Sequence, residues 1–298
     1  MIIFITADPT HPTKNQIVQT FKHSNILLKV IPPSICLFKL RKLIQSKATI
    51  CLLAPDHPRA FKICRNLVKG SISCINLPEI TLLCRNRIGI NTQIRNLLDR
   101  FKYNHPNAPI WIPKSHFHPK VSQFFSQARA HKVEFPIVIK YPINHSGVHF
   151  VRLINHLEDI KKIPKRFSTH GIYTEQYVNS QELLLKCYNL GDTIITQEES
   201  NHPTLEQLSK EHKELINSIM NRKTIQTPLI IREFVNFITK ELPISIFGVD
   251  FLITNDNSFI LVDFNDFPGA RGIPNAGEII ANFILREQKK IESQLLAV

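Results

Sequence analysis

FGVDFLITNDNSFILVDFNDFPGARGIP, residues Phe247–Pro274, contains two apolar runs, and each run carries oxygen ligands where a buried strand would carry Val or Ile. Asp250 lies in the first run. Asp263 and Asn265 lie in the second, two residues apart and therefore on one face of a strand. Oxygen ligands that converge from neighbouring strands suit Mg²⁺, which prefers one or two carboxylates together with substrate phosphates. The alternative is a surface hairpin whose polar residues only face water.

The length and composition of the chain are those of a globular protein. Its 298 residues can form one large domain or two modest ones, and 43% hydrophobic residues is an ordinary content for a buried core. No apolar run approaches the length of a membrane span, so we expect no transmembrane segment. The opening MIIFITADP resembles a short strand and a turn rather than a signal peptide, which predicts a cytoplasmic protein.

The charge of the chain indicates an anionic partner. There are 37 Lys and Arg residues against 24 Asp and Glu residues, which gives a formal net charge of +13. Such an excess attracts nucleic acids, phosphorylated small molecules or acidic peptides. No helix-turn-helix, RNA-binding aromatic motif or zinc finger accompanies it, and a nucleic-acid binder would leave the three oxygen ligands unexplained. We therefore expect a small anionic partner; the oligomeric state stays open.

The six cysteines are scattered without any CxxC spacing, and most lie in apolar surroundings. This pattern favours small buried thiols over zinc ligands or disulfides. The cysteines therefore take no part in the chemistry that the sequence predicts.

The first eighty residues alternate between strand and helix patterns. Short apolar runs at Ile2–Ile5, Ile26–Val30 and Ile50–Leu53 predict strands, and Lys14–Lys22 and Ser34–Ser46 have the apolar spacing of helices. This order predicts a small parallel sheet with flanking helices. The segment has no GxGxxG motif, so a dinucleotide site is not supported.

The middle of the chain predicts a helix and then a series of strands. The helix covers Glu79–Phe101, and the run PIVIK, Pro136–Lys140, predicts a buried strand that ends on a lysine. The hairpin YPINHSGVHFVRL follows it. The next strands are IYTEQYV (Ile172–Val178) and ELLLKCYNLGD (Glu182–Asp192), and Lys186 interrupts the apolar run of the second.

The rest of the chain is mainly helical outside the opening stretch. Residues 201–227 are polar and predict a helix flanked by loops. Apolar residues from Ile231 to Leu242 recur at helical spacing, and Ala276–Ser293 predicts a final helix.

Three features now stand in one order: a lysine at a strand end, a lysine within a later strand, and the Asp…Asp-x-Asn strand pair. Nucleotide phosphates need cations on rigid strands and magnesium between their oxygens. Together these features resemble the ATP-grasp superfamily over essentially the whole chain. The resemblance implies an α/β (α+β) protein with an N-terminal Rossmann-like pre-ATP-grasp domain and two α+β subdomains that grip the nucleotide. We expect the parts to cover residues 1–82, 83–180 and 181–298.

The resemblance assigns roles to three cationic residues. Arg87, in LLCRNR, stands where the superfamily has its first basic ATP contact. Lys140 resembles the PxVxK lysine that reaches the α- and β-phosphates, and Lys186 resembles the second lysine near the phosphates, with a catalytic role.

The resemblance also assigns the hinge, the metal ligands and the acceptor loop. Main-chain groups of Glu175, Gln176, Tyr177 and Val178 match the segment that binds adenine. Asp250, Asp263 and Asn265 match the ligands of Mg²⁺, with Mn²⁺ as an alternative ion. Pro268–Pro274 matches the segment that faces the acceptor. One departure is the phosphate loop YPINHSGVH, which has only Gly147 where the superfamily is usually rich in glycine, so its contacts stay open.

Two branches of the superfamily compete for the function. DFNDFPG, the position of His145 five residues after Lys140, and QYVNSQELLLK resemble the inositol 1,3,4-trisphosphate 5/6-kinase group. The acidic QEESN after Asp192 and the single Lys14 near the N-terminus do not fit that group, because an acidic segment would repel a polyphosphate. The alternative is a carboxylate–amine ligase, similar to the ribosomal-protein glutamate ligase and glutathione synthetase group.

We therefore expect an ATP-dependent enzyme that transfers the γ-phosphoryl group to a small anionic acceptor. The acceptor is an inositol phosphate in the kinase hypothesis and an amino acid or acidic peptide in the ligase hypothesis. His145 would orient the acceptor, and Arg271 would bind its anionic group, since arginine suits bidentate contact with phosphate or carboxylate. The alternatives are an ordinary exposed loop histidine and a solvent-facing arginine.

Overall fold

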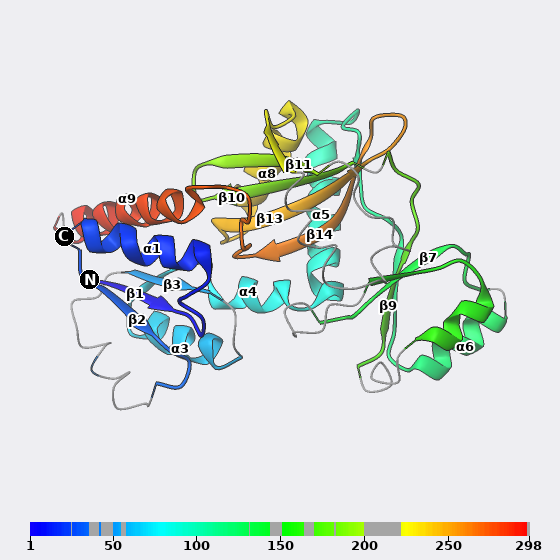
Figure 1. Ribbon diagram of the computed structural model, residues 1–298, viewed down its shortest axis with the longest axis horizontal. Coiled ribbons are helices and arrows are strands. Elements are labelled where there is room, and N and C mark those ends of the chain that lie inside the picture. The colour runs from blue at the N-terminus through cyan, green and yellow to red at the C-terminus, as the bar shows by residue number, and fades with distance from the viewer. Residues whose placement is uncertain are drawn as a thin grey trace.

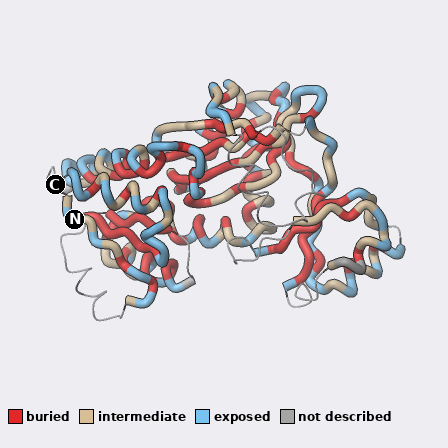
Figure 2. The backbone as a smooth tube through the Cα atoms, viewed as in Figure 1, coloured by how far each residue is buried: buried red, intermediate tan, exposed pale blue. Residues whose placement is uncertain are grey.

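A computed structural model describes most of the chain, which forms three sheets with flanking helices (Figure 1). The described residues are 1–24, 26–35, 42, 50–54, 58–130, 132–143, 151–163, 170–181, 183–199 and 222–296. Buried positions follow the strands of all three sheets and the inner faces of the helices (Figure 2). Within these residues, no helix is both long enough and apolar enough to cross a membrane.

The N-terminal sheet is parallel, with helices on both faces, as the alternating pattern predicts. Its strands, in spatial order, are β2 (Leu28–Ile31), β1 (Ile2–Ile5), β3 (Ile50–Leu53) and β4 (Ser73–Ile75). Helix α1 (Pro12–His23) packs on the face that carries Ile2 and Phe4, and α3 (Pro58–Lys69) packs on the face that carries Ile3 and Ile5. The two central strands, β1 and β3, are buried on both sides, which explains their continuous apolar runs.

The central sheet is antiparallel and has one helix-covered face. Its order is β6 (Ser115–His118), β9 (Ile172–Gln176), β7 (Ile137–Lys140) and β8 (Val151–Ile154). Helix α6 (Val121–Arg129) and the 3-10 helix η1 (Leu157–Lys162) pack on the face that carries Ile137, Ile139 and Ile172. Strand alternation places Lys140, Tyr173 and Glu175 on the opposite face.

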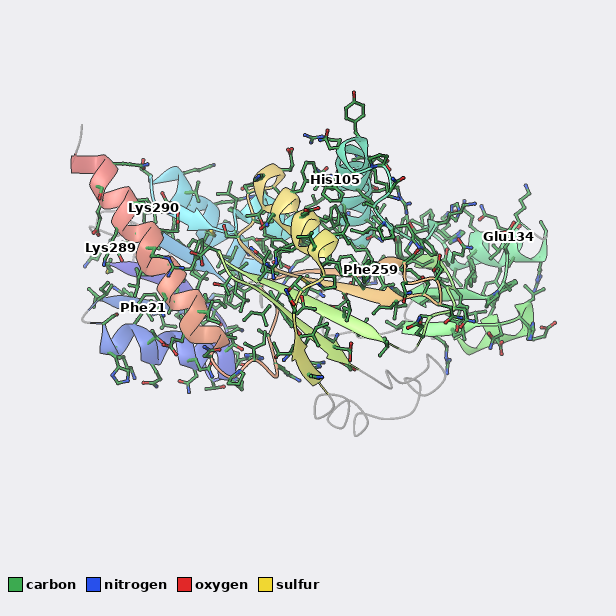
Figure 3. The ribbon with its side chains drawn as sticks, turned by 90° about the horizontal axis from the view of Figure 1, so that it is seen from above. Phe21, His105, Glu134, Phe259, Lys289 and Lys290 are labelled. Atoms are coloured by element: carbon green, nitrogen blue, oxygen red, sulfur yellow. The ribbon has the colours of Figure 1, made fainter. Side chains whose placement is uncertain are left out.

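The C-terminal sheet contains the stretch with the oxygen ligands. Its order is β12 (Arg222–Ile225), β11 (Ile194–Glu199), β10 (Leu184–Leu190), β13 (Ile246–Ile253), β14 (Phe259–Asp266) and β5 (Ile110–Trp111). Helices α5 (Arg87–Asn104) and α8 (Leu229–Glu241) cover one face through the largest hydrophobic core. Helix α9 (Ala276–Leu296) packs beside α1 and joins this sheet to the N-terminal one (Figures 1 and 3).

Two predicted elements are wrong in detail. The single helix over Glu79–Phe101 is broken into α4 (Pro78–Cys84) and α5, because the side chain of Asn86 accepts hydrogen bonds from the amides of Ile88 and Gly89 and starts a new helix. In the polar segment 201–227, residues Arg222–Ile225 form an edge strand rather than a loop. Most of the predicted helix Ser34–Ser46 lies outside the described residues, as do residues 200–221.

Asn76 connects the end of the N-terminal sheet to β13. Its Nδ2 donates to the carbonyl of Ile246 at 2.6 Å, and its Oδ1 accepts from the amides of Ser245 and Ile246, both at 2.9 Å. The residue is buried and has a positive φ of 58°, a conformation that asparagine tolerates better than most residues.

Replacing Asn76 by alanine is expected to lower the free energy of unfolding by about 2–4 kcal/mol, because buried main-chain groups lose their partner and a Cβ residue remains at positive φ. Asn76→Gly relieves only the backbone strain and should cost less than the alanine variant. Urea unfolding of the three proteins measures both differences. An alanine variant as stable as the wild type would contradict the role of this contact.

Candidate nucleotide and metal site

A row of polar residues crosses the C-terminal sheet at one level. The strand register pairs Gln197 of β11 with Lys186 of β10, Lys186 with Asp250 of β13, and Asp250 with Asp263 of β14. Asn265 lies two residues beyond Asp263 on the same strand. All five side chains therefore leave the sheet on the face opposite α5 and α8. The structure brings together the three oxygen ligands and the strand lysine that the sequence singled out.

The apolar residues between these polar ones explain why the row faces outward. Val249, Phe251 and Phe264 alternate with Asp250 and Asp263 and are buried against α5 and α8. Moving the register by one residue would bury the carboxylates and expose the aromatic rings. The hydrophobic effect therefore fixes which face of the sheet carries the acids.

Lys186 and Asp250 form an ion pair within the row. The Lys186 Nζ lies 2.9 Å from Asp250 Oδ2. Burial lowers the pKa of Lys186, but the charge and hydrogen bond of Asp250, together with electrostatic contributions from Tyr188 and Glu199, outweigh burial, so the net pKa is raised and the lysine stays charged. Burial, with Asp250 beside it, raises the pKa of the Tyr188 hydroxyl to about 12, so that this residue is a neutral hydroxyl.

Asp263 is held by a cation and an amide. Arg87 Nη1 donates to Asp263 Oδ1 at 2.8 Å, and Asn265 Nδ2 donates to Oδ2 at 2.8 Å. Arg87 stands at the first position of α5, and its Nε donates to the carbonyl of Tyr141 at 2.9 Å. Burial alone would raise the pKa of Asp263, but the charges of Arg87 and Lys140 outweigh it and hold the pKa well below its usual range.

The low pKa of Asp263 predicts a loss of stability in acid. Its pKa is lowered in the folded state, so its ionised form stabilises the protein above the unfolded pKa of about 3.9, and this contribution is lost as the pH falls toward the folded value. The difference in unfolding free energy between wild type and Asp263→Asn should be constant from pH 7 to 5 and shrink below about pH 4. Denaturant titrations at each pH measure it, and a difference unchanged at pH 3 would contradict the assignment.

Lys140 connects the central sheet to the C-terminal sheet. Its Nζ lies 2.5 Å from Glu175 Oε2 in the neighbouring strand β9 and donates to the carbonyl of Val262 in β14 at 2.7 Å. Both side chains are at least 92% buried, since 8% of Lys140 and 5% of Glu175 is exposed. Asn91 of α5 contacts the other Glu175 oxygen at 3.4 Å and also donates to the hydroxyl of Tyr173. The sequence predicted only a main-chain role for Glu175; its side-chain role depends on the strand register and was missed.

The predicted hinge follows β9 directly. The amide of Gln176 donates to the carbonyl of Lys114 at 2.8 Å, and that of Tyr177 donates to the carbonyl of Pro136 at 3.2 Å. These bonds fix the path of the chain between the central and C-terminal sheets. They also occupy two of the main-chain donors that the resemblance assigned to adenine.

The loop Pro268–Pro274 is tied down from two directions. Thr13 Oγ1 donates to the carbonyl of Gly269 at 2.6 Å, and Gln16 Nε2 donates to that of Pro274 at 2.6 Å. From the other side, Arg222 Nη1 donates to the carbonyl of Arg271 at 3.1 Å. The side chain of Arg271 is exposed.

Gly272 and His11 add detail to this loop. Gly272 has φ +89°, a backbone conformation that favours glycine, and a Cβ there would lie 2.9 Å from the side-chain amide nitrogen of Gln197. His11 lies against Gly269, and burial, together with the charges of Lys14 and Arg271, lowers its pKa. His11, Lys14 and Arg271 therefore lie in one region. The sequence analysis did not identify His11, because its position beside Arg271 depends on the fold.

In the acidic segment QEESN, which follows Asp192 in the sequence, one of the two glutamates is neutralised by an arginine. Glu199 Oε2 accepts from Arg222 Nε at 2.9 Å, and 2% and 11% of the two side chains are exposed. Glu198 alternates to the opposite face of β11, where it pairs in register with Leu185. Neither residue therefore presents a free carboxylate beside Lys186. His145 and Gly147 lie outside the described residues, as does the rest of 144–150.

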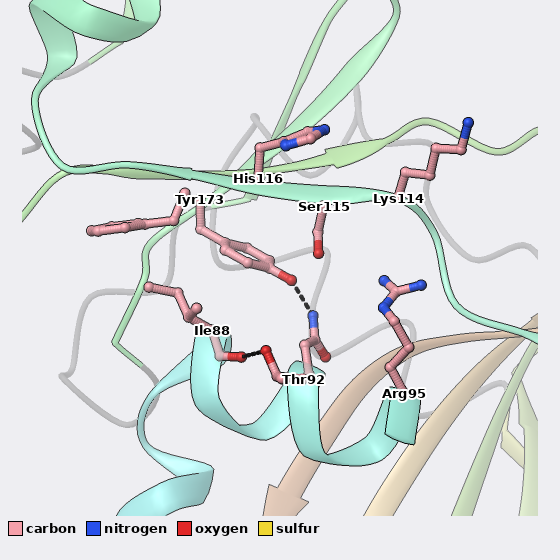
Figure 4. A pocket seen from close by; sticks show the side chains of 9 residues that line it. Ile88, Thr92, Arg95, Lys114, Ser115, His116 and Tyr173 are labelled. Atoms are coloured by element: carbon pink, nitrogen blue, oxygen red, sulfur yellow. Dashed lines mark hydrogen bonds between the residues drawn. The ribbon is translucent and has the colours of Figure 1, made fainter. Parts of the chain in front are cut away.

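A pocket of about 310 Å³ lies between the N-terminal half of α5 and strands β6 and β9 (Figure 4). Asn91, which contacts the Glu175 partner of Lys140, and Tyr173, whose hydroxyl accepts from Asn91, form part of its wall. Arg95, Lys114 and His116 contribute the cationic and basic groups of the rim (Figure 4). The Arg95 guanidinium donates to the carbonyls of Ile112 and Pro113, at 3.4 and 2.9 Å.

Comparison with known proteins identifies the class first by fold. A RimK domain ATP-grasp protein from Sphaerobacter thermophilus superposes with a TM-score of 0.62 at 14% identity, covering 96% of this chain and all of the other. D-alanyl-alanine synthetase A from Vibrio cholerae gives 0.61 at 13% identity, covering 97% of each chain. N5-carboxyaminoimidazole synthetase from Staphylococcus aureus gives 0.61 at 13% identity, covering 95% of this chain and 77% of the other. The protein has the ATP-grasp fold, as predicted.

The particular family follows from the sequence match. The model of the inositol 1,3,4-trisphosphate 5/6-kinase ATP-grasp domain matches residues 112–286, more than half of the chain. The chain belongs to this family and is an ATP-grasp enzyme, so the predicted resemblance is confirmed. No curated protein matches the chain.

Proposed function

We propose that this protein is a Mg-ATP-dependent kinase that transfers the γ-phosphoryl group of ATP to a hydroxyl of a small anionic acceptor of the inositol phosphate class. The observation that carries the proposal is the row Lys186–Asp250–Asp263, with Lys140 contacting β14 from the central sheet. The family match, which spans Lys140 and both metal-ligand strands, supports the kinase branch.

The three cations would bind the triphosphate. Arg87, Lys140 and Lys186 lie on rigid elements, and each is held by a carboxylate that fixes its position. A triphosphate that binds beside them would share these cations with the carboxylates, and its charge would be neutralised before the reaction begins. The main-chain amide of Val178 would donate to adenine, because those of Gln176 and Tyr177 already have partners.

The oxygen ligands fit magnesium. Two carboxylates in register and the nearby amide of Asn265 form a set of hard oxygen donors, and the low pKa of Asp263 keeps it ionised at neutral pH. Asp250, Asp263 and the amide oxygen of Asn265 would hold the ion. When bound, magnesium would neutralise charge on the phosphate oxygens.

The acceptor would approach from the side of the Pro268–Pro274 loop. His11, Lys14 and Arg271 supply a basic region there, and the Glu199–Arg222 pair removes part of the repulsion expected from the acidic segment. The acceptor hydroxyl would form a bond to the γ-phosphorus as the bond to the β-phosphate oxygen breaks. ADP leaves, and the hydroxyl proton passes to solvent.

A carboxylate–amine ligase is the second candidate. The acidic QEESN segment after Asp192 favours it, because that segment does not fit the kinase group, and the structural neighbours with the same fold include proteins described as RimK domain ATP-grasp and D-alanyl-alanine synthetase A. In this hypothesis the acceptor oxygen belongs to a carboxylate, and an amine then displaces the phosphate.

Incubation with γ-labelled ATP, Mg²⁺ and a panel of inositol phosphates and amino acids separates the two candidates. The kinase proposal expects label on one inositol phosphate with an equal amount of ADP. If inorganic phosphate appears only when an acid and an amine are both present, the kinase proposal is rejected and the protein is a ligase.

A further inference from the structure

Three cysteines that are far from any motif spacing meet in the N-terminal sheet. Cys51 lies on β3, Cys64 on α3 and Cys74 on β4. Their Sγ atoms all lie within 4.8 Å of one another, and those of Cys64 and Cys74 are 2.9 Å apart. The sequence predicted separate buried thiols, because spacings of 13 and 10 residues match no CxxC motif. The three cysteines form no sequence motif, but the fold of the N-terminal sheet places their sulfur atoms together.

The β3–α3–β4 connection explains why the three cysteines lie close together. Cys51 and Cys74 are register partners on adjacent parallel strands, so their side chains leave the sheet on the same face. Helix α3 connects these two strands and packs over that face, where Cys64 belongs to the same hydrophobic cluster as Cys51. Cys51 and Cys64 have no exposed surface, whereas Cys74 is partly exposed.

We propose that Cys51, Cys64 and Cys74 form a binding site for one soft, monovalent d¹⁰ metal ion, with Cu(I) as its type, held by three sulfur ligands. No step of the ATP chemistry uses these thiols. Thiolate ligands select soft ions such as Cu(I) over the hard ions that carboxylates and carbonyls prefer. The site therefore complements, and does not compete with, the oxygen ligands proposed for magnesium.

The number of ligands favours Cu(I) over Zn(II). Structural zinc sites are almost always four-coordinate, with ligands from Cys, His or carboxylates. Among the residues that the structure describes, the group contains three such side chains and no fourth. Two carbonyl oxygens also contact the group: Cys74 Sγ lies 3.6 Å from that of Ile75 and 3.5 Å from that of Asn76.

Metal binding would release protons from the group. Each thiol that becomes a ligand loses its proton to solvent through the partly exposed Cys74 side. Cu(I) enters and stays as Cu(I), so no oxidant or reductant is consumed.

The site would stabilise the junction between the sheets. Cys74 is two residues from Asn76, whose side chain holds β13, the strand of Asp250. A metal ion that connects β3, α3 and β4 would fix the position of Asn76. Binding should therefore raise the thermal unfolding midpoint of the protein, because an ion that binds only the folded state stabilises it.

The test is a competition for Cu(I) between the full-length reduced protein and a chromogenic Cu(I) chelator under anaerobic conditions. Wild type should retain one ion, and X-ray absorption should show sulfur ligands alone. Cys64→Ser and Cys74→Ser should each weaken retention by more than the roughly 10- to 100-fold that outer-shell partners cost. Cys84→Ser removes a buried thiol of α4 outside the group and should retain the ion like wild type.

Three results would overturn the proposal. One is equal Cu(I) retention by wild type and both cluster variants, with their folds verified by circular dichroism. Another is a preference for Zn(II) over Cu(I) in parallel competition. The third is a reduced protein that retains no Cu(I) but forms a Cys64–Cys74 disulfide when treated with a thiol oxidant, which would make the group a redox pair. An increase in the thermal unfolding midpoint with Cu(I) that is absent in Cys64→Ser would support the proposed Cu(I) site independently.

Discussion

Replacing Asp263 by asparagine is expected to reduce ATP turnover by at least ~100-fold while the protein stays folded. The substitution keeps the shape of the side chain but removes the negative charge that pairs with Arg87 and that would bind the metal. Asp263→Ala should have the same effect on turnover. The rate of ADP release with saturating Mg²⁺ and ATP measures it.

Asp256→Asn is the matched control for this prediction. Asp256 lies in the turn between β13 and β14, where it accepts hydrogen bonds from Ser258 at 3.1 and 3.4 Å and does not belong to the polar row. Its loss should leave turnover near the wild-type value. Wild-type turnover from Asp263→Asn would remove the metal assignment, whereas equal losses in both variants would indicate damage to the hairpin instead.

The second large effect is expected at Lys140. Lys140→Met should weaken ATP binding by roughly 10- to 100-fold, the cost of one or two charge-assisted hydrogen bonds to phosphate. It should also lower the free energy of unfolding by about 3–5 kcal/mol, because Glu175 becomes a buried carboxylate without its cation. The two effects have different causes, so they can be separated.

A double variant separates them. Lys140→Met/Glu175→Gln removes the unpaired buried charge and should recover much of the stability but none of the nucleotide affinity. Lys114→Met removes an exposed lysine that directly precedes strand β6. It serves as the control for a general loss of positive charge. Calorimetry gives the affinities, and urea unfolding gives the stabilities. An unchanged affinity in Lys140→Met would reject its phosphate role.

The sequence predicted those parts of the site that follow from strand alternation. Asp263 and Asn265 share a face because they are two residues apart, and Lys140 ends an apolar run. The parallel N-terminal sheet follows from its alternating strand and helix patterns. These inferences depend on local periodicity, which the chain keeps almost everywhere.

The parts that the sequence did not predict depend on contacts between distant segments. The Lys140–Glu175 pair requires the register of β7 with β9, and the Glu199–Arg222 pair requires β12, which the polar pattern concealed. The break at Asn86 depended on a single capping side chain inside a helical pattern. A register between strands is set by tertiary packing, so no local pattern could give these contacts.

We propose that ATP binds between the central and C-terminal sheets, through magnesium and the cations Arg87, Lys140 and Lys186. The most direct test is a calorimetric titration of the protein with a non-hydrolysable ATP analogue, with Mg²⁺ and then with EDTA. We expect one bound nucleotide whose affinity falls sharply in EDTA and in Asp263→Asn. Binding that is equally tight with and without magnesium, or no binding at all, would contradict it.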